Sequence, residues 1–254
     1  MDGMKIGSDW TIDVVSAEAK PLTLIWIAPG QFLMGSPPDE AGRSDSEGPF
    51  VATLSRGFWL GRYLVTQAQW MAVTGENPSH FRDAGPDHPV ENVSWVDVMA
   101  FCDLLNRRYG GDLPPGYRFQ PPSEVEWEYA CRAGSQARYC YGDDTALLSA
   151  YAWHRENSAG ITHPVGEKAP NAWGLYDVHG LVAEWCLDQK GEYPSAPAVD
   201  WIGEGDGAIR AMRSSTYGTA LDSSGHRCAC RPYMVPQEER PWFGFRLCVS
   251  ASGR

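Results

Sequence analysis

The side chains best suited to metal or redox chemistry lie in one short segment, which runs from His226 to Cys230. If this segment is an extended strand, alternate side chains share a face, so that His226, Cys228 and Cys230 point the same way. One imidazole and two thiols form a ligand set that suits a soft metal such as zinc or copper. Buried thiols without a metal are the commoner use of such cysteines, and we favour that interpretation.

The other cysteines and histidines show no comparable grouping. The chain has 254 residues and seven cysteines, an odd number in a protein that is not small, so a dense disulfide framework is not predicted. A bond between Cys228 and Cys230 is disfavoured, because a separation of two residues in a strand strains disulfide geometry. The histidines His154, His163 and His179 are scattered along the sequence.

Composition and charge exclude several classes of protein. Hydrophobic residues make up 43% of the chain, which is ample for a core, while 27 Gly, 19 Pro and 11 Trp predict irregular backbone packed with aromatic rings. The net charge of −11 disfavours binding to a nucleic acid, because phosphates would be repelled. No leader-like start and no membrane-spanning apolar run is visible, so we expect a cytoplasmic protein that does not contact membranes.

Short elements separated by turns must position the reactive groups. The segments 22–28 and 31–34 flank a Pro-Gly pair, and this pattern predicts a β-hairpin. Three helices are predicted from their capping residues, which are Thr66 with Gln69, Ser94, and Ser123 with Glu126. No linker or internal repeat divides the sequence, so residues 1–254 are predicted to form one domain.

Seven short phrases follow one another in a fixed order along the chain. They are Pro29 to Ser36, Val65 to Trp70, Asn77 to Phe81, Pro89 to Trp95, Pro122 to Ala130, Gly174 to Gly180 with Glu184-Trp185, and Gly244 to Leu247. Together they resemble the formylglycine-generating-enzyme (sulfatase-modifying-factor) family, with a match from about Leu22 to Leu247. The resemblance implies an α+β, C-type-lectin-like fold with little regular secondary structure.

The resemblance does not by itself decide the function, because one fold carries many roles. Relatives include copper-dependent oxidases that make formylglycine, sulfoxide synthases, siderophore tailoring proteins and non-catalytic variable ligand-binding proteins. In the copper oxidases two cysteines, five residues apart, follow a Gly-Gly-Ser-Tyr-like stretch. Here those positions fall on Thr219 and on Ser223 or Ser224. Hydroxyls cannot replace thiolates toward Cu(I), so we expect neither copper binding nor formylglycine formation by the family mechanism.

The same resemblance predicts a structural calcium site. Asp177, Gly180, Val182 and Glu184 fall on positions that bind Ca²⁺ in the family. Two carboxylates and two backbone carbonyls would form the all-oxygen shell that calcium prefers. Leu181 stands where the family usually has Asn, but that Asn is not a side-chain ligand in this alignment. The alternative is a plain acidic turn without a metal.

Two classes of function follow from these patterns. The loss of both cysteine positions favours a module that binds a protein, a peptide or a small molecule, and Tyr, Ser and His suit adaptable recognition. The predicted contact residues are Tyr217, Thr219, Ser223, Ser224, His226, Cys228, Tyr233 and Trp242. The alternative is an enzyme of other chemistry, such as oxidative tailoring of a peptide or an amino-acid derivative. That alternative requires a pocket with convergent titratable groups.

Overall fold

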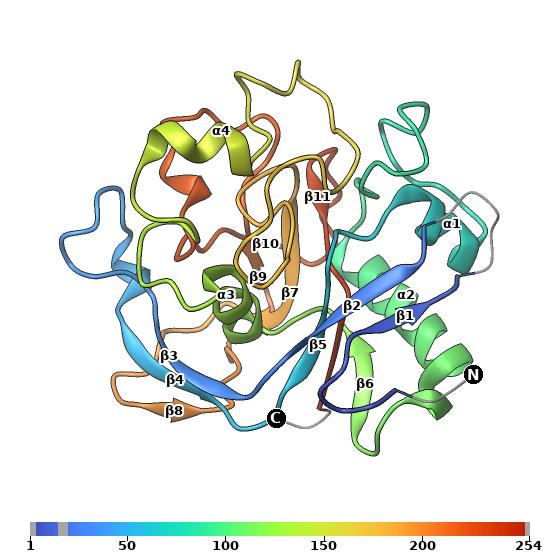
Figure 1. Ribbon diagram of the computed structural model, residues 1–254, viewed down its shortest axis with the longest axis horizontal. Coiled ribbons are helices and arrows are strands. Elements are labelled where there is room, and N and C mark those ends of the chain that lie inside the picture. The colour runs from blue at the N-terminus through green and yellow to red at the C-terminus, as the bar shows by residue number, and fades with distance from the viewer. Residues whose placement is uncertain (1–3, 15–19, 252–254) are drawn as a thin grey trace.

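Three small β-sheets form the framework of the computed structural model, which describes residues 4–14 and 20–251 (Figure 1). The first sheet is antiparallel throughout. Its strands, in spatial order, are β1 (Trp10–Ile12), β2 (Leu22–Ile27), β5 (Phe58–Gly61), β12 (Cys248–Ala251) and β6 (Tyr117–Gln120). This sheet therefore joins segments from both halves of the chain.

The other two sheets are smaller, and each contains one parallel pair. The second sheet has the order β10 (Tyr233–Met234), β9 (Arg210–Arg213), β7 (Ala183–Gln189) and β11 (Phe243–Gly244). The third has the order β3 (Gly30–Met34), β4 (Phe50–Leu54) and β8 (Ala198–Val199). The parallel pairs are β7 with β11 and β4 with β8. Many of these strands are two to four residues long, as the Gly and Pro content predicted.

Two helices pack with the first sheet to form the larger hydrophobic core. They are α1 (Gln67–Thr74) and α2 (Trp95–Tyr109), and both begin at the predicted capping residues. On α2 the side chains of Val98, Phe101 and Leu105 are fully buried, because their spacing places them on one face. The ring of Phe101 stacks on Trp70 of α1 at 4.9 Å. Hydrophobic periodicity and capping therefore located these two helices correctly.

The third predicted helix lies between the sheets and belongs to a second core. This helix, α3 (Glu124–Arg132), contacts β3, β7 and β9, and Figure 1 shows it near the centre of the molecule. Its Trp127 and Ala130 pack in the same cluster as Phe32 and Phe50 from the third sheet. The remaining helix, α4 (Leu148–Tyr151), is a single turn. Short 3₁₀ turns occur at Asp45–Glu47, Gly110–Asp112, Thr145–Leu147 and Ser224–His226.

The α+β fold class is confirmed, but the predicted hairpin is wrong. β2 pairs with β1 and β5, whereas β3 pairs with β4 in a different sheet. The Pro29-Gly30 corner therefore passes the chain from one sheet to the next instead of folding it back on itself. Within the described residues, none of the helices is both long enough and apolar enough to cross a bilayer.

Candidate functional site

Residues 214–226, which we call the hydroxyl loop, follow β9 and carry the positions where copper ligands were predicted to be lost. The Thr219 hydroxyl lies 3.0 Å from that of Thr216 and also accepts a hydrogen bond from the Thr216 amide. The Ser223 hydroxyl accepts from the Gly225 amide. Thr219 and Ser223 therefore use their hydroxyls to shape the loop.

The hydroxyl loop is anchored on residues 154–158, which follow α4. Ser158 donates a hydrogen bond to the Tyr217 carbonyl at 2.8 Å, and the Leu221 amide donates to the Glu156 carboxylate at 2.9 Å. The Arg155 amide donates to the Thr219 carbonyl. These bonds join two segments that lie about 60 positions apart in the sequence. The loop is thus held in one conformation by the fold around it.

The predicted contact residues do not all face an outside ligand. Tyr233 and Trp242 are 47% and 40% exposed. Thr219, Ser223 and Ser224 are half-buried. In contrast, Tyr217, His226 and Cys228 are buried, with at most 7% of each side chain exposed. The prediction that these last three present their side chains at the surface is therefore corrected. Their side chains pack inward, where Tyr217 meets the ring of Phe81 and Cys228 meets the sulfur of Cys131.

The predicted grouping of His226, Cys228 and Cys230 is also absent. His226 ends a 3₁₀ turn, so the alternation expected of a strand does not apply. Its two ring nitrogens lie 2.8 Å and 3.0 Å from the carbonyl oxygens of His179 and Ala220. Both ring nitrogens therefore face backbone carbonyl oxygens in this arrangement. The favoured interpretation of a buried thiol holds for Cys228, which is fully buried.

Cys228 instead meets a different pair of residues. Its sulfur lies 3.6 Å from that of Cys131 on α3, and His179 completes a buried group whose ligand atoms are all within 4.8 Å of one another. The His179 Nδ1 bonds the His226 carbonyl, and its Nε2 accepts a hydrogen bond from the Cys140 amide. Burial lowers the pKa of His179 to about 3 and raises the pKa of Cys131. His179 and Cys131 are therefore neutral at pH 7, and a metal would first have to displace the Cys140 amide.

The turn predicted to bind calcium fits that ion only in part. The Oδ2 of Asp177 accepts from the Gly166 amide, whereas its Oδ1 has no hydrogen-bond partner among the described residues. Burial raises the pKa of this carboxyl to about 6. Glu184 does not offer a free oxygen, because Arg246 binds both of its oxygens at 2.7 and 2.9 Å and Trp127 adds a third bond. Calcium binding at this turn stays a prediction.

Backbone geometry constrains the residues at positions 180 and 181 of this turn. A side chain at Gly180 would collide with the Trp153 carbonyl, so only glycine allows the turn to approach that segment. Leu181, at the position of the usual Asn, has a positive φ of 75° and a fully buried side chain. Its carbonyl accepts a hydrogen bond from the Tyr217 amide. The predicted calcium turn and the hydroxyl loop are therefore neighbours.

A buried carboxyl beside the hydroxyl loop escaped the sequence analysis. Glu91 is fully buried, its Oε1 accepts from the Phe81 amide at 2.8 Å, and its Oε2 has no hydrogen-bond partner among the described residues. The Phe81 ring meets the Tyr217 ring edge-on at 5.6 Å. Burial raises the pKa of Glu91, and burial together with Glu91 raises the pKa of Tyr217 to about 12. The Tyr217 phenol is therefore neutral at pH 7.

Comparison with known proteins places this site in a family. Residues 13–251 match the family model described as "Sulfatase-modifying factor enzyme 1-like domain". The chain belongs to the formylglycine-generating-enzyme family. The family match spans nearly the whole chain and extends beyond both ends of the predicted range of 22–247.

Three relatives illustrate the breadth of this family. The formylglycine-generating enzyme of Streptomyces coelicolor is 33% identical over 184 residues, which cover 65% of this chain and 54% of that enzyme. The structure of Treponema denticola variable protein 1 is 29% identical with a TM-score of 0.82, covering 94% of this chain and 98% of the other. The structure of PvdO from Pseudomonas aeruginosa is 27% identical with a TM-score of 0.79, covering 97% and 99%. This chain therefore shares its fold with these two solved structures.

The sequence did contain one overlooked signal, which is the spacing of carboxylates on α3. Glu124, Glu126 and Glu128 all lie on this helix, and none is more than 1% exposed. Buried carboxylates require partners, so three of them beside Trp127 indicate internal cations. No comparable signal marked Glu91, because a single Glu in a loop is usually solvated.

Proposed function

We propose that this protein is a member of the formylglycine-generating-enzyme family that binds a ligand or a partner beside the hydroxyl loop and has no copper oxidase activity. The observation that carries the proposal is the chemistry of the loop itself. Thr219, Ser223 and Ser224 supply hydroxyls where the copper oxidases supply thiolates. The described cysteines nearest in sequence, Cys228 and Cys230, lie beyond the 3₁₀ turn, and Cys228 is enclosed by the core.

The surface beside this loop suits recognition of a protein, a peptide or a small molecule. Trp242 is exposed, and its carbonyl accepts a hydrogen bond from the amide of Ala183. Two residues before Ala183, the carbonyl of Leu181 accepts a hydrogen bond from the amide of Tyr217 in the hydroxyl loop. An exposed indole and several hydroxyls on an anchored loop combine apolar contact with adaptable hydrogen bonding. We place the protein in the cytoplasm, as its sequence predicts.

Copper chemistry offers the direct test of this proposal. The protein is incubated with Cu(I), oxygen and a sulfatase-type cysteine peptide, and aldehyde formation is followed by mass spectrometry. We expect a rate no higher than that of free copper, because soft thiolate ligands are missing from the loop. The matched variant Thr219→Cys/Ser224→Cys should bind Cu(I) more tightly than the wild type. Aldehyde formation by the wild-type protein above the free-copper rate would contradict the proposal.

A second candidate function is favoured by Glu91. A buried carboxyl with a raised pKa and one open oxygen, close to a tyrosine, is the kind of group that acts as a general acid or base. We propose oxidative tailoring of a peptide or an amino-acid derivative as this alternative. Metal-dependent oxygen consumption that requires a peptide, and that Glu91→Gln abolishes without unfolding the protein, would establish the enzyme. Absence of oxygen consumption, or an unchanged rate in Glu91→Gln, would contradict this enzymatic alternative.

We also propose a structural calcium ion at the turn from Asp177 to Glu184, as the family resemblance implies. The open oxygen of Asp177 supports this proposal, whereas Arg246 competes with any cation for Glu184. Calcium that binds only the native state stabilises it by about 2.7 kcal/mol at a hundred times Kd. The melting temperature should therefore rise with calcium and fall with a chelator, and Asp177→Ala should abolish both responses. A wild-type melting temperature that is indifferent to both additions would leave an acidic turn without a metal.

A further inference from the structure

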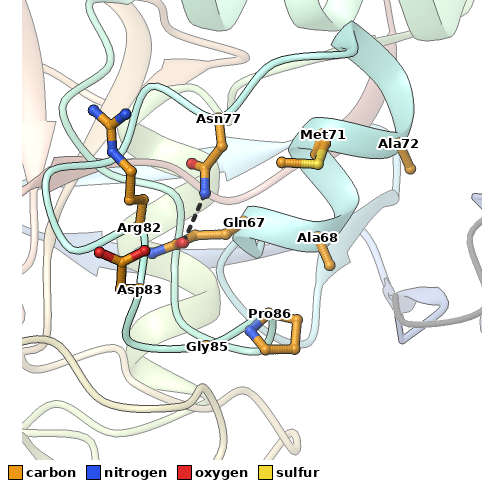
Figure 2. Close-up of a pocket in the computed structure, with 9 residues that line it drawn as sticks. All are labelled: Gln67, Ala68, Met71, Ala72, Asn77, Arg82, Asp83, Gly85 and Pro86. Carbon is orange, nitrogen blue, oxygen red and sulfur yellow. Dashed lines mark hydrogen bonds between the residues drawn. The ribbon is translucent and has the colours of Figure 1, made fainter.

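A cavity lies away from the hydroxyl loop, between α1 and the loop of residues 77–86 (Figure 2). Its volume is about 430 Å³, which falls within the range of small-molecule sites. One wall is a face of α1, and the other is the loop that follows this helix. The residues that line it are Gln67, Ala68, Met71, Ala72, Asn77, Arg82, Asp83, Gly85 and Pro86.

The cavity is built into the fold, because a buried side chain holds its two walls together. Gln67 is only 2% exposed, its amide donates to the Phe81 carbonyl, and its oxygen accepts from the Asn77 amide at 2.9 Å. The amide of Ala68 donates to the Pro86 carbonyl, which fixes the far end of the loop to the first turn of α1. Both walls are therefore in place before any ligand arrives, which reduces the entropy lost on binding.

The two ends of the cavity differ in polarity. Figure 2 shows Arg82 and Asp83 at one end and Met71 and Ala72 at the other, with Ala68 on the apolar side. Among the described residues, neither Arg82 nor Asp83 forms an ion pair, and both side chains are exposed. Met71 is 48% exposed although it is a large apolar side chain on a helix. Two side chains of opposite charge, from adjacent residues, thus lie at one end, and an uncovered apolar surface occupies the other.

We propose that this cavity binds a zwitterionic α-amino acid with a long apolar side chain. The carboxylate of the ligand pairs with the Arg82 guanidinium, and its ammonium group pairs with the Asp83 carboxylate. The apolar side chain covers Met71, Ala68 and Ala72, which removes their surface from water. A ligand with a single charge can pair with only one of Arg82 and Asp83, and an uncharged apolar ligand can pair with neither.

This assignment is independent of the proposed function, because none of the cavity residues belongs to the hydroxyl loop. The 77–86 loop nevertheless connects the two regions, since the amide of its Phe81 bonds Glu91 and its ring contacts Tyr217. A ligand in the cavity would rest against the outer side of the same loop. The test therefore measures binding directly and leaves copper and oxygen chemistry aside.

The experiment is calorimetric titration of the whole protein with L-leucine and three analogues, each of which lacks one recognised group. Glycine lacks the apolar side chain, isoamylamine lacks the carboxylate, and 4-methylpentanoate lacks the ammonium group. We expect saturable binding of leucine and at least tenfold weaker binding of each analogue, since every analogue forfeits one contact. Absence of saturable leucine binding at millimolar concentrations would overturn the proposal.

Three variants locate the binding in the cavity. Arg82→Gln and Asp83→Asn should each weaken leucine binding about tenfold or more, and Met71→Glu should weaken leucine without affecting the weak binding of glycine. Arg107→Gln serves as the matched control, because Arg107 is an exposed arginine on α2 outside the cavity. All of these side chains are exposed, so the variants should fold. If leucine binds Arg82→Gln and Asp83→Asn as tightly as the wild type, the ligand binds elsewhere and the proposal is overturned.

Discussion

The protonation state of His179 illustrates how much a single residue is decided by its surroundings. Its Nε2 accepts the Cys140 amide, so that nitrogen cannot carry a proton while the bond persists. Burial accordingly lowers its pKa from 6.5 to about 3. In the unfolded chain the imidazole takes up a proton near its ordinary pKa, whereas in the folded protein it remains neutral. The unfolded state therefore binds more protons between these two pH values.

This difference predicts how stability changes with pH. The contribution of His179 is complete above about pH 6.5 and is lost as the pH falls toward about 3, at about 1.4 kcal/mol per pH unit. We expect His179→Gln to flatten the acid limb of a plot of unfolding free energy against pH, measured by urea denaturation. His80→Gln, at an exposed histidine, is the control and should leave the limb largely unchanged. Identical slopes for His179→Gln and the wild type would show that the native imidazole is protonated after all.

At the scale of elements, the helices rest on interactions that are local in sequence. The Ser123 hydroxyl accepts from the Glu126 amide at 3.2 Å, and the Glu126 carboxylate accepts from the Ser123 amide at 2.8 Å. This reciprocal pair confirms the capping box predicted for α3. Ser123→Ala leaves one amide of the first turn without an acceptor and should cost about 0.5–2 kcal/mol, measured as a lower denaturation midpoint. Ser123→Thr keeps the hydroxyl and should retain most of the stability. Equal midpoints for Ser123→Ala and the wild type would mean that packing alone maintains the helix.

At the scale of the whole molecule, a buried network of charges ties α3 to distant parts of the chain. Arg213 on β9 bonds Glu128 at 2.7 Å and lies 3.2 Å from Glu124, and Arg231 binds both oxygens of Glu124. Arg231 also donates to the Ser46 carbonyl, which precedes β4. The arginines and glutamates are almost completely buried, so each charge depends on its partners. The network therefore connects segments that the three sheets leave apart.

Removal of a charged pair from this network should cost less than the two single removals added together. We expect Arg213→Met to destabilise the protein by about 3–5 kcal/mol, because Glu124 and Glu128 lose a buried cation. The double variant Arg213→Met/Glu128→Gln should cost clearly less than the sum of its two single changes, since both single changes remove the same ion pair between Arg213 and Glu128. Chemical denaturation of the four proteins in this cycle provides the measurement. Strictly additive costs would show that Arg213 and Glu128 contribute independently.

Features that depend on residues close together in the sequence could be predicted, whereas features that depend on residues far apart in the sequence could not. Helix limits on α1, α2 and α3 depend on groups three or four residues apart, so capping residues and hydrophobic spacing located them correctly. The ordered phrases from Pro29 to Leu247 likewise established the family and its fold class. Which strands pair could not be obtained in the same way, because β5 lies beside β12 through contacts almost 190 positions apart. The predicted hairpin is wrong for this reason.

The functional residues show the same dependence on distance. Cys228 meets Cys131 across 97 positions, and Arg227 binds Glu47 across 180. Residue types near His226 indicated reactive groups, but whether a group faces a metal, a carbonyl or solvent depends on which distant segment packs against it. The cavity between α1 and the loop of residues 77–86 could not be predicted for the same reason, since it exists only once this loop folds back over α1. Local hydrogen bonds and hydrophobic periodicity depend on short stretches of sequence, whereas burial and pKa values depend on the path of the whole chain.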